Sequence, residues 1–192
     1  MSFTMSVSAF FTFLRHNTPD IPWNHWLVIS VFSIASVLVL FVRKKTLSSY
    51  TIIVFGLSVF IALLLFDVMV FTRVCGISPH SCGFDLAAEY TRLVKGNESQ
   101  RSQMLVNAIA FIPLGFFISE FFSSVKQFRI VRQIEFVSLC SFGLSLCIEF
   151  MQLALCMGVF EITDLVMNTL GGFSGASMAA LGRALFSRIK SK

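Results

Sequence analysis

Residues 138–180 read SLCSFGLSLCIEFMQLALCMGVFEITDLVMNTLGGFSGASMAA, and they place carboxylates, amides and hydroxyls within otherwise apolar helical patterns. In the first half, polar residues and cysteine recur every three or four positions, at Ser138, Ser141, Ser145, Glu149, Gln152 and Cys156. This spacing gathers side chains on one face of an α-helix. The second half repeats the pattern with Asp164, Asn168, Gly171, Gly175 and Gly182. We therefore predict a hairpin of two helices whose polar faces are joined by a tight loop near Gly158.

The composition indicates the solvent that these helices face. Hydrophobic residues make up 56% of the 192 residues and charged residues only 13%, with a mean hydropathy of +0.82. Soluble domains carry about 25% charged residues. Five stretches approach the roughly 20 apolar residues that a bilayer requires: 26–42, 51–72, 104–122, 134–157 and 164–186. We predict an all-α, polytopic membrane helix bundle with about five transmembrane helices, plus short interfacial helices, in a single domain over residues 26–192.

The basic residues predict the orientation of the bundle. Ten of the fifteen Lys and Arg residues fall in the segments after the first and third stretches and in the C-terminal part from Arg183 onward. By the positive-inside rule these segments face the cytoplasm. The N-terminus and an extracytoplasmic loop at 73–103 then lie outside, in a bacterial cytoplasmic (inner) membrane. The net charge of +5 reflects this topology, and it gives no reason to expect a nucleic-acid partner.

Two segments outside the predicted spans carry further expectations. Residues 1–25 are rich in Phe, lack the features of a signal peptide, and are interpreted as an interfacial segment in preference to a disordered one. The loop at 73–103 contains Cys75 and Cys82, whose position on the oxidising side of the membrane makes a disulfide plausible. Cys140, Cys147 and Cys156 lie within or at the end of a span, where cysteines usually serve packing.

Five polar side chains share one depth when the spans are threaded alternately through the membrane. They are Asn107, Glu149, Gln152, Asp164 and Asn168. Asp67 and Arg73 flank the outer boundary of the second span, where they could extend the same layer or pair for structural reasons alone. Pro113 and Gly115 follow Asn107 in the third span, where the proline frees a backbone carbonyl and the glycine permits close helix packing.

These motifs together resemble the VanZ-like family. The resemblance rests on Asn107, Phe111, Pro113 and Gly115, on Ser145, Glu149 and Gln152, and on the run FEITDLVMNTLGG at 160–172, within a family-like region at about 51–187. The family pattern has an Arg and an acidic residue where this chain has Met157 and Thr163. The resemblance implies an integral membrane protein linked to low-level teicoplanin resistance, a phenotype of the cell envelope, and it supplies no mechanism.

Three interpretations of the polar layer follow. In the first, the layer is an extracytoplasmic pocket that binds a lipid headgroup, a lipid-linked precursor or a glycopeptide antibiotic. In the second, Glu149 and Asp164 form an acid and base pair that acts on a lipid-linked envelope precursor. In the third, the polar groups are interhelical hydrogen bonds that only stabilise the bundle. We prefer the first, because no nucleophile with an adjacent base, metal-ligand spacing or cofactor motif is visible, and the three histidines fall outside the layer.

The glycines of the last span indicate a packing role. Gly171, Gly175 and Ala179 form a small-residue stripe at four-residue spacing, which lets helix backbones approach closely. We expect this stripe to contact the third or fourth span, and dimerisation through it remains an alternative.

Overall fold

The computed structural model describes residues 22–43, 47–71, 98–125, 129–155 and 160–190, and nearly all of them are helical. The helices are α2 (Trp23–Arg43), α3 (Ser49–Phe71), α5 (Glu98–Val125), α6 (Ile130–Ala154) and α7 (Ile162–Lys190). No strand occurs among these residues. Four of the helices, α2, α3, α5 and α6, are long and apolar enough to cross a membrane. The all-α membrane bundle predicted from composition is confirmed.

The fifth helix, α7, is less apolar than the other four. At 29 residues it measures about 43 Å, more than the roughly 30 Å of a bilayer core. Its buried face consists largely of glycine, alanine and polar residues, which lowers its hydropathy. At one end of α7, Glu161 contacts Glu149 of α6, and near the other end Arg183 contacts Gln133 of α6. Helix α7 therefore runs alongside α6 for most of the length of α6.

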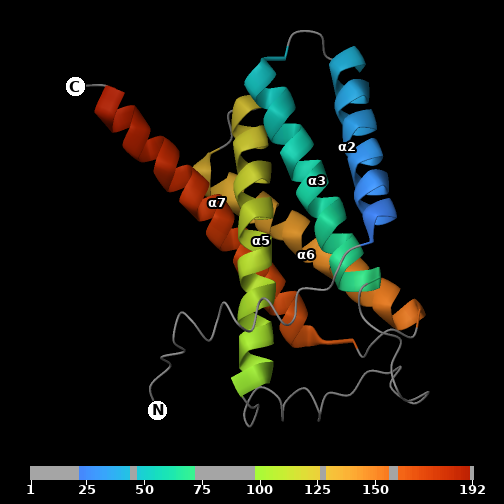
Figure 1. Cartoon of the computed structure of the whole chain (residues 1–192). Helices are drawn as coiled ribbons and strands as arrows, with labels where there is room; N and C mark the ends of the chain where they lie inside the picture. Colours follow the sequence, from blue (N-terminus) through green and yellow to red (C-terminus); the bar gives the residue numbers. More distant parts are fainter. Residues whose placement is uncertain (1–21, 44–46, 72–97, 126–128, 156–159, 191–192) are drawn as a thin grey trace.

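Consecutive helices run in alternating directions, as Figure 1 shows. We name the two ends of the bundle after α2: the Trp23 end, where α2 begins, and the Arg43 end, where it finishes. In three neighbouring pairs, a polar contact marks the register of the two helices. His25 meets Asp67 between α2 and α3, Tyr50 meets Glu120 between α3 and α5, and Asn168 meets Ser145 between α7 and α6.

The parallel helices α5 and α7 share the most extensive contact in the bundle. It is built from glycines, because a Cβ atom on Gly171 would strike the carbonyl of Ala108, and one on Gly175 would lie 2.7 Å from the amide nitrogen of Phe116. Gly115 lies in the same way against the backbone of Gly172. The small-residue stripe of the last span therefore packs against the third span. Pro113, predicted to take part in helix packing, is exposed within α5.

Apolar side chains fill the space between α3, α5 and α6. Leu65 and Val70 of α3, Phe111 and Leu114 of α5, and Ile148 of α6 form one buried cluster. Among the described helices, α2 has its extensive contact with α3 and stands at the side of the bundle (Figure 1). Buried polar residues nevertheless occur along the length of the bundle, among them Ser58, Ser141 and Glu149.

Candidate functional site: a polar layer at the Trp23 end

The buried face of α6 carries polar groups along almost its whole length. Its buried residues are Gln133, Val137, Ser141, Ser145, Ile148, Glu149 and Gln152. The predicted polar face is thus confirmed at four positions but not at Ser138, which is half-buried and donates to the carbonyl of Ile134 at 2.8 Å. From Ser145, steps of four residues through Ser141 and Val137 continue the buried face to Gln133 instead. Cys156 lies outside the described residues.

Glu149 is 1% exposed and points toward the start of α7, away from lipid. Its Oε2 accepts a hydrogen bond of 2.8 Å from the backbone amide of Glu161, the residue just before α7. The first amides of a helix lack intrahelical partners, and the positive end of the helix dipole favours a carboxylate there. Asp164, which is 4% exposed, occupies the first turn of α7. The junction between α6 and α7 therefore holds two buried carboxyl groups.

Three amide side chains surround this junction. Asn168 of α7 donates to the hydroxyl of Ser145 at 2.8 Å, and Gln152 of α6 donates to the carbonyl of Met69 on α3 at 2.8 Å. Asn107 of α5 precedes Ala108, whose carbonyl lies against Gly171, one turn beyond Asn168. The structure thus brings all five predicted residues to the Trp23 end of the bundle, each at most 6% exposed. We call Asn107, Glu149, Gln152, Asp164 and Asn168 the Glu149 layer.

Several polar atoms of the Glu149 layer have no hydrogen-bond partner. They are Nδ2 of Asn107, Oε1 of Gln152 and Oδ1 of Asn168, each fully buried. A buried donor or acceptor without a partner costs about 1 to 3 kcal/mol. One unmatched donor and two unmatched acceptors, contributed by three helices, therefore leave the layer with hydrogen-bonding capacity that a ligand can complete.

Asp67 extends the layer toward α2 through a partner that the sequence analysis did not assign. Nδ1 of His25 lies 2.8 and 3.0 Å from the two carboxylate oxygens of Asp67. His25 is not one of the five residues of the Glu149 layer, but it contacts Asp67, which the sequence offers as an extension of that layer. Antiparallel helices place the start of α2 beside the end of α3, and this threading was the signal for the pair. Arg73, the partner considered from sequence, lies outside the described residues.

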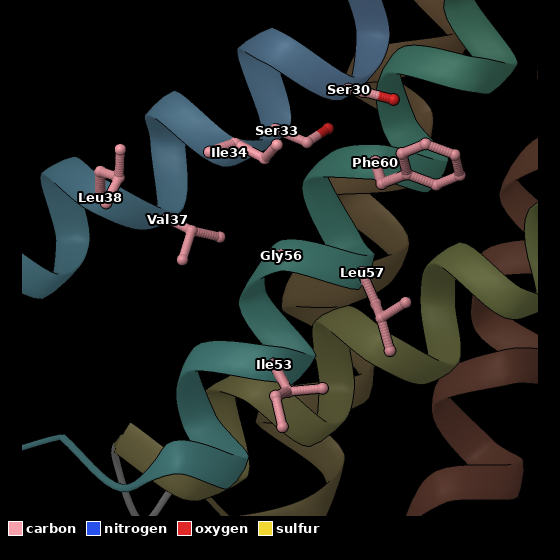
Figure 2. Close-up of a pocket in the computed structure, with 9 residues that line it drawn as sticks. All are labelled: Ser30, Ser33, Ile34, Val37, Leu38, Ile53, Gly56, Leu57 and Phe60. Carbon is pink, nitrogen blue, oxygen red and sulfur yellow. The ribbon is translucent and has the colours of Figure 1, made fainter. Parts of the chain in front are cut away.

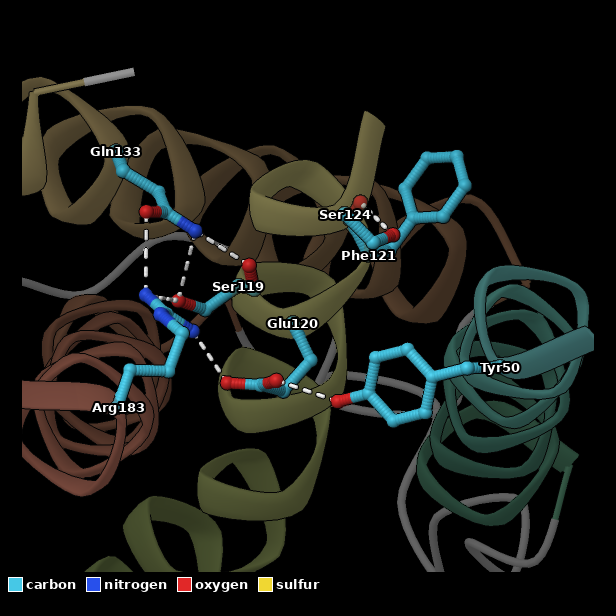
Figure 3. Close-up of polar contacts among 7 residues, drawn as sticks. All are labelled: Tyr50, Ser119, Glu120, Phe121, Ser124, Gln133 and Arg183. Carbon is cyan, nitrogen blue, oxygen red and sulfur yellow. Dashed lines mark hydrogen bonds and ion pairs between the residues drawn. The ribbon is translucent and has the colours of Figure 1, made fainter. Parts of the chain in front are cut away.

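A second polar group, near the Arg43 end, was missed from the sequence. Figure 3 shows Tyr50, Ser119, Glu120, Gln133 and Arg183, which we call the Arg183 cluster. Arg183 forms an ion pair with Glu120 and donates to Oε1 of Gln133 at 3.2 Å and to the hydroxyl of Ser119 at 3.4 Å. The other carboxylate oxygen of Glu120 accepts from the Tyr50 hydroxyl at 2.5 Å. Arg183 had been counted only among the topology-setting charges, although an acid such as Glu120 within an apolar span requires a partner.

The remaining predicted features fall partly outside the described residues. Cys75 and Cys82 lie there, so their disulfide stays a prediction. Cys140 is a half-buried and Cys147 an exposed free thiol on α6. Ser141 has no partner for its hydroxyl, which packs directly against Gly172. The described residues contain no group of three His, Cys, Asp or Glu side chains placed to hold a metal ion.

Comparison of the sequence with known proteins identifies the family. The VanZ/LLP1 family model matches residues 68–183, a region that contains the whole Glu149 layer and Arg183. The chain belongs to this family of membrane proteins. It is also 34% identical over 79 residues to Protein VanZ of Enterococcus faecium, in an alignment that covers 41% of the chain and 45% of that relative. The chain thus spans less than half the length of that relative. No solved structure matches.

Proposed function

We propose that this protein acts at the bacterial cell envelope by binding an envelope component or a glycopeptide-type antibiotic at the Glu149 layer. The Trp23 end then faces out of the inner membrane and the C-terminus lies in the cytoplasm, as the distribution of basic residues predicts. Family membership supports a role linked to antibiotic resistance, and the chemistry of the layer supports the binding role.

The unmatched buried atoms of Asn107, Gln152 and Asn168 are the observation that carries this proposal. A layer that served only to hold helices together would be expected to satisfy its own donors and acceptors, as most buried polar groups do. Here one donor and two acceptors remain, beside two carboxyl groups. This combination suits a ligand that carries hydroxyl and amide groups together with a cationic group, since the carboxylates attract the cation and the amides bind the neutral groups.

An enzymatic role remains the second candidate, because Glu149 and Asp164 are both buried at the same junction. Two carboxyl groups in different surroundings can act as an acid and base pair on a lipid-linked precursor. The Glu161 amide donates to Oε2 of Glu149 and holds that carboxyl group in place, which suits a base or an anchoring group. Turnover of a lipid-linked envelope precursor by the purified protein would decide for this role and against simple binding.

The test compares Glu149→Gln with Glu135→Gln, an exposed glutamate on the same helix. The amide that replaces the Glu149 carboxylate keeps an oxygen that can accept from the Glu161 backbone amide, so the fold should persist. We expect Glu149→Gln to abolish the effect of the protein on teicoplanin susceptibility at unchanged thermal stability in detergent, and Glu135→Gln to change neither. Normal susceptibility with Glu149→Gln would reject the layer as the binding site.

A further inference from the structure

The antiparallel register of α6 and α7 places the two buried carboxyl groups of the Glu149 layer at the same level. Ser145 of α6 accepts a hydrogen bond of 2.8 Å from Asn168 of α7, so these two residues lie opposite each other. One turn nearer the Trp23 end, Glu149 follows Ser145 by four residues. On the facing helix, Asp164 precedes Asn168 by four. The two acids, 1% and 4% exposed, therefore lie at the same turn of the helix pair.

Two amide oxygens lie one turn from these acids, and neither has a hydrogen-bond partner. Gln152 and Asn168 each use their amide nitrogen in a hydrogen bond of 2.8 Å to another helix. Their oxygens, Oε1 and Oδ1, remain unpartnered in side chains that are each 1% exposed. Helical side chains incline toward the start of their own helix, so Gln152 leans toward the turn of Glu149. Asn168 likewise leans toward the turn of Asp164, and both oxygens are aimed at the level of the carboxyl groups.

This set of side chains is rich in acceptors and suits a calcium ion. Each carboxylate offers two oxygens and each amide one, six in all. Calcium takes roughly six to eight oxygen ligands, from carboxylates and from Asn or Gln carbonyls. Its two positive charges balance those of the two carboxylates. Magnesium suits the layer less well, because it keeps several bound waters and side chains this deeply buried leave little room for them.

We propose that the Glu149 layer binds a calcium ion through Glu149, Gln152, Asp164 and Asn168. The sequence shows no metal-ligand spacing because the ligands come from two helices and half of them are amides. This inference deepens the proposed function, and rests on it only for the envelope ligand. The ion supplies the positive charge that the carboxylates attract, in place of a cationic group on that ligand. Nδ2 of Asn107 then remains to donate to the ligand beside the ion.

The groove between α2 and α3 lacks the chemistry for such an ion. It encloses about 420 Å³, and Figure 2 shows apolar side chains along it together with Ser30 and Ser33. None of its lining residues is charged. An ion there would lose its water without gaining carboxylate ligands, which is costly. Calcium binding is therefore expected at the layer and not in this groove.

The first test measures calcium binding by the purified full chain in an uncharged detergent, after treatment with a chelator and without any antibiotic. We expect about one ion per chain, with a dissociation constant near 10⁻⁴ to 10⁻³ M, as in extracellular calcium modules. Calcium should also raise the unfolding temperature more than magnesium does at the same concentration. Glu149→Gln should weaken binding at least about tenfold, since the charge of the ligands sets calcium affinity.

The matched control is Glu135→Gln, at an exposed position of the same helix, which should bind calcium as the unmodified protein does. The absence of saturable calcium binding would overturn the proposal. Equal binding by the two variants, or equal stabilisation by magnesium and calcium, would also overturn it.

The second test does not depend on how Glu149→Gln folds. Asn168→Asp adds a third carboxylate beside Glu149 and Asp164, so without calcium the repulsion among like charges should lower the unfolding temperature. Saturating calcium should restore that temperature, and binding should strengthen at least about tenfold. Two acids that only share a proton would leave this variant equally destabilised with and without calcium, and that result would reject the ion.

The two proposals fail in distinguishable ways, because calcium binding is measured without an envelope ligand. Calcium binding by the unmodified protein, together with normal teicoplanin susceptibility in Glu149→Gln, would support the ion and reject the proposed function. Loss of the resistance phenotype in Glu149→Gln, in a protein that binds no calcium, would reject the ion and keep the proposed function.

Discussion

The bundle contains two buried polar groups that differ in how completely they satisfy themselves. In the Arg183 cluster, the ion pair with Glu120 is supported by Tyr50, Ser119 and Gln133, and none of its buried side-chain atoms lacks a partner (Figure 3). In the Glu149 layer, three buried amide atoms have none. Side chains of four helices meet in the first, where a closed network stabilises one arrangement. The second retains unused donors and acceptors, and the proposed binding role rests on this difference.

The substitution Gly175→Leu should have the largest effect, because it separates α5 from α7 and so disrupts both groups together. A side chain at this position meets the backbone of Ile112 and Phe116, which cannot move aside without shifting α5. We expect a loss of about 3 kcal/mol in the free energy of unfolding, the upper end of the usual cost of overpacking, measured by thermal or denaturant unfolding in detergent. Gly143→Leu on α6 is the control, since a Cβ there meets nothing within 4 Å. Equal stability of the two variants would contradict the glycine contact.

The substitution Arg183→Ala should come next, because it leaves the largely buried Glu120 carboxylate without its cation. Breaking such a pair costs about 3 kcal/mol, somewhat less here because the Arg183 side chain is 28% exposed. Unfolding in detergent measures the loss, and Arg132→Ala, at an exposed position of α6, should be neutral. The double variant Arg183→Leu with Glu120→Leu should recover much of the stability. If it does not, the loss in Arg183→Ala does not come from leaving Glu120 without its cation.

The substitution Gln152→Leu should destabilise the protein far less than Arg183→Ala, although Gln152 is only 1% exposed. It removes the hydrogen bond to Met69 but also removes an unmatched acceptor, so the two contributions of about 1 kcal/mol each nearly cancel. Teicoplanin susceptibility should nevertheless change as it does for Glu149→Gln. A stability loss as large as that of Arg183→Ala would erase the distinction between the two polar groups.

The substitution Tyr50→Phe should have the smallest effect. It removes one hydrogen bond to Glu120 from an exposed tyrosine and keeps the ring. We expect the free energy of unfolding in detergent to fall by about 1 kcal/mol or less. Teicoplanin susceptibility should not change. Loss of the resistance phenotype at nearly full stability would instead give the Arg183 cluster a functional role of its own.

Much of the Glu149 layer was predictable because the signals are local. The spacing of Ser141, Ser145, Glu149 and Gln152 repeats the helical period, and polar residues in an apolar span must turn inward. Alternating threading then places Asn107 and Asp164 at the same depth. Ser138 was misassigned because steps of three and of four fit a short pattern equally well. Only packing against α7 selected the face that continues through Val137 to Gln133.

The sequence by itself determined that this chain is an all-α membrane protein, where its helices lie and which family it belongs to, because composition and period follow directly from the bilayer's demand for apolar, internally hydrogen-bonded segments. Only the tertiary structure decided which polar side chains pair with one another. Glu120 and Arg183 are separated by 63 residues, and His25 and Asp67 by 42. Such contacts arise from the rotation and tilt of whole helices, which no local pattern encodes.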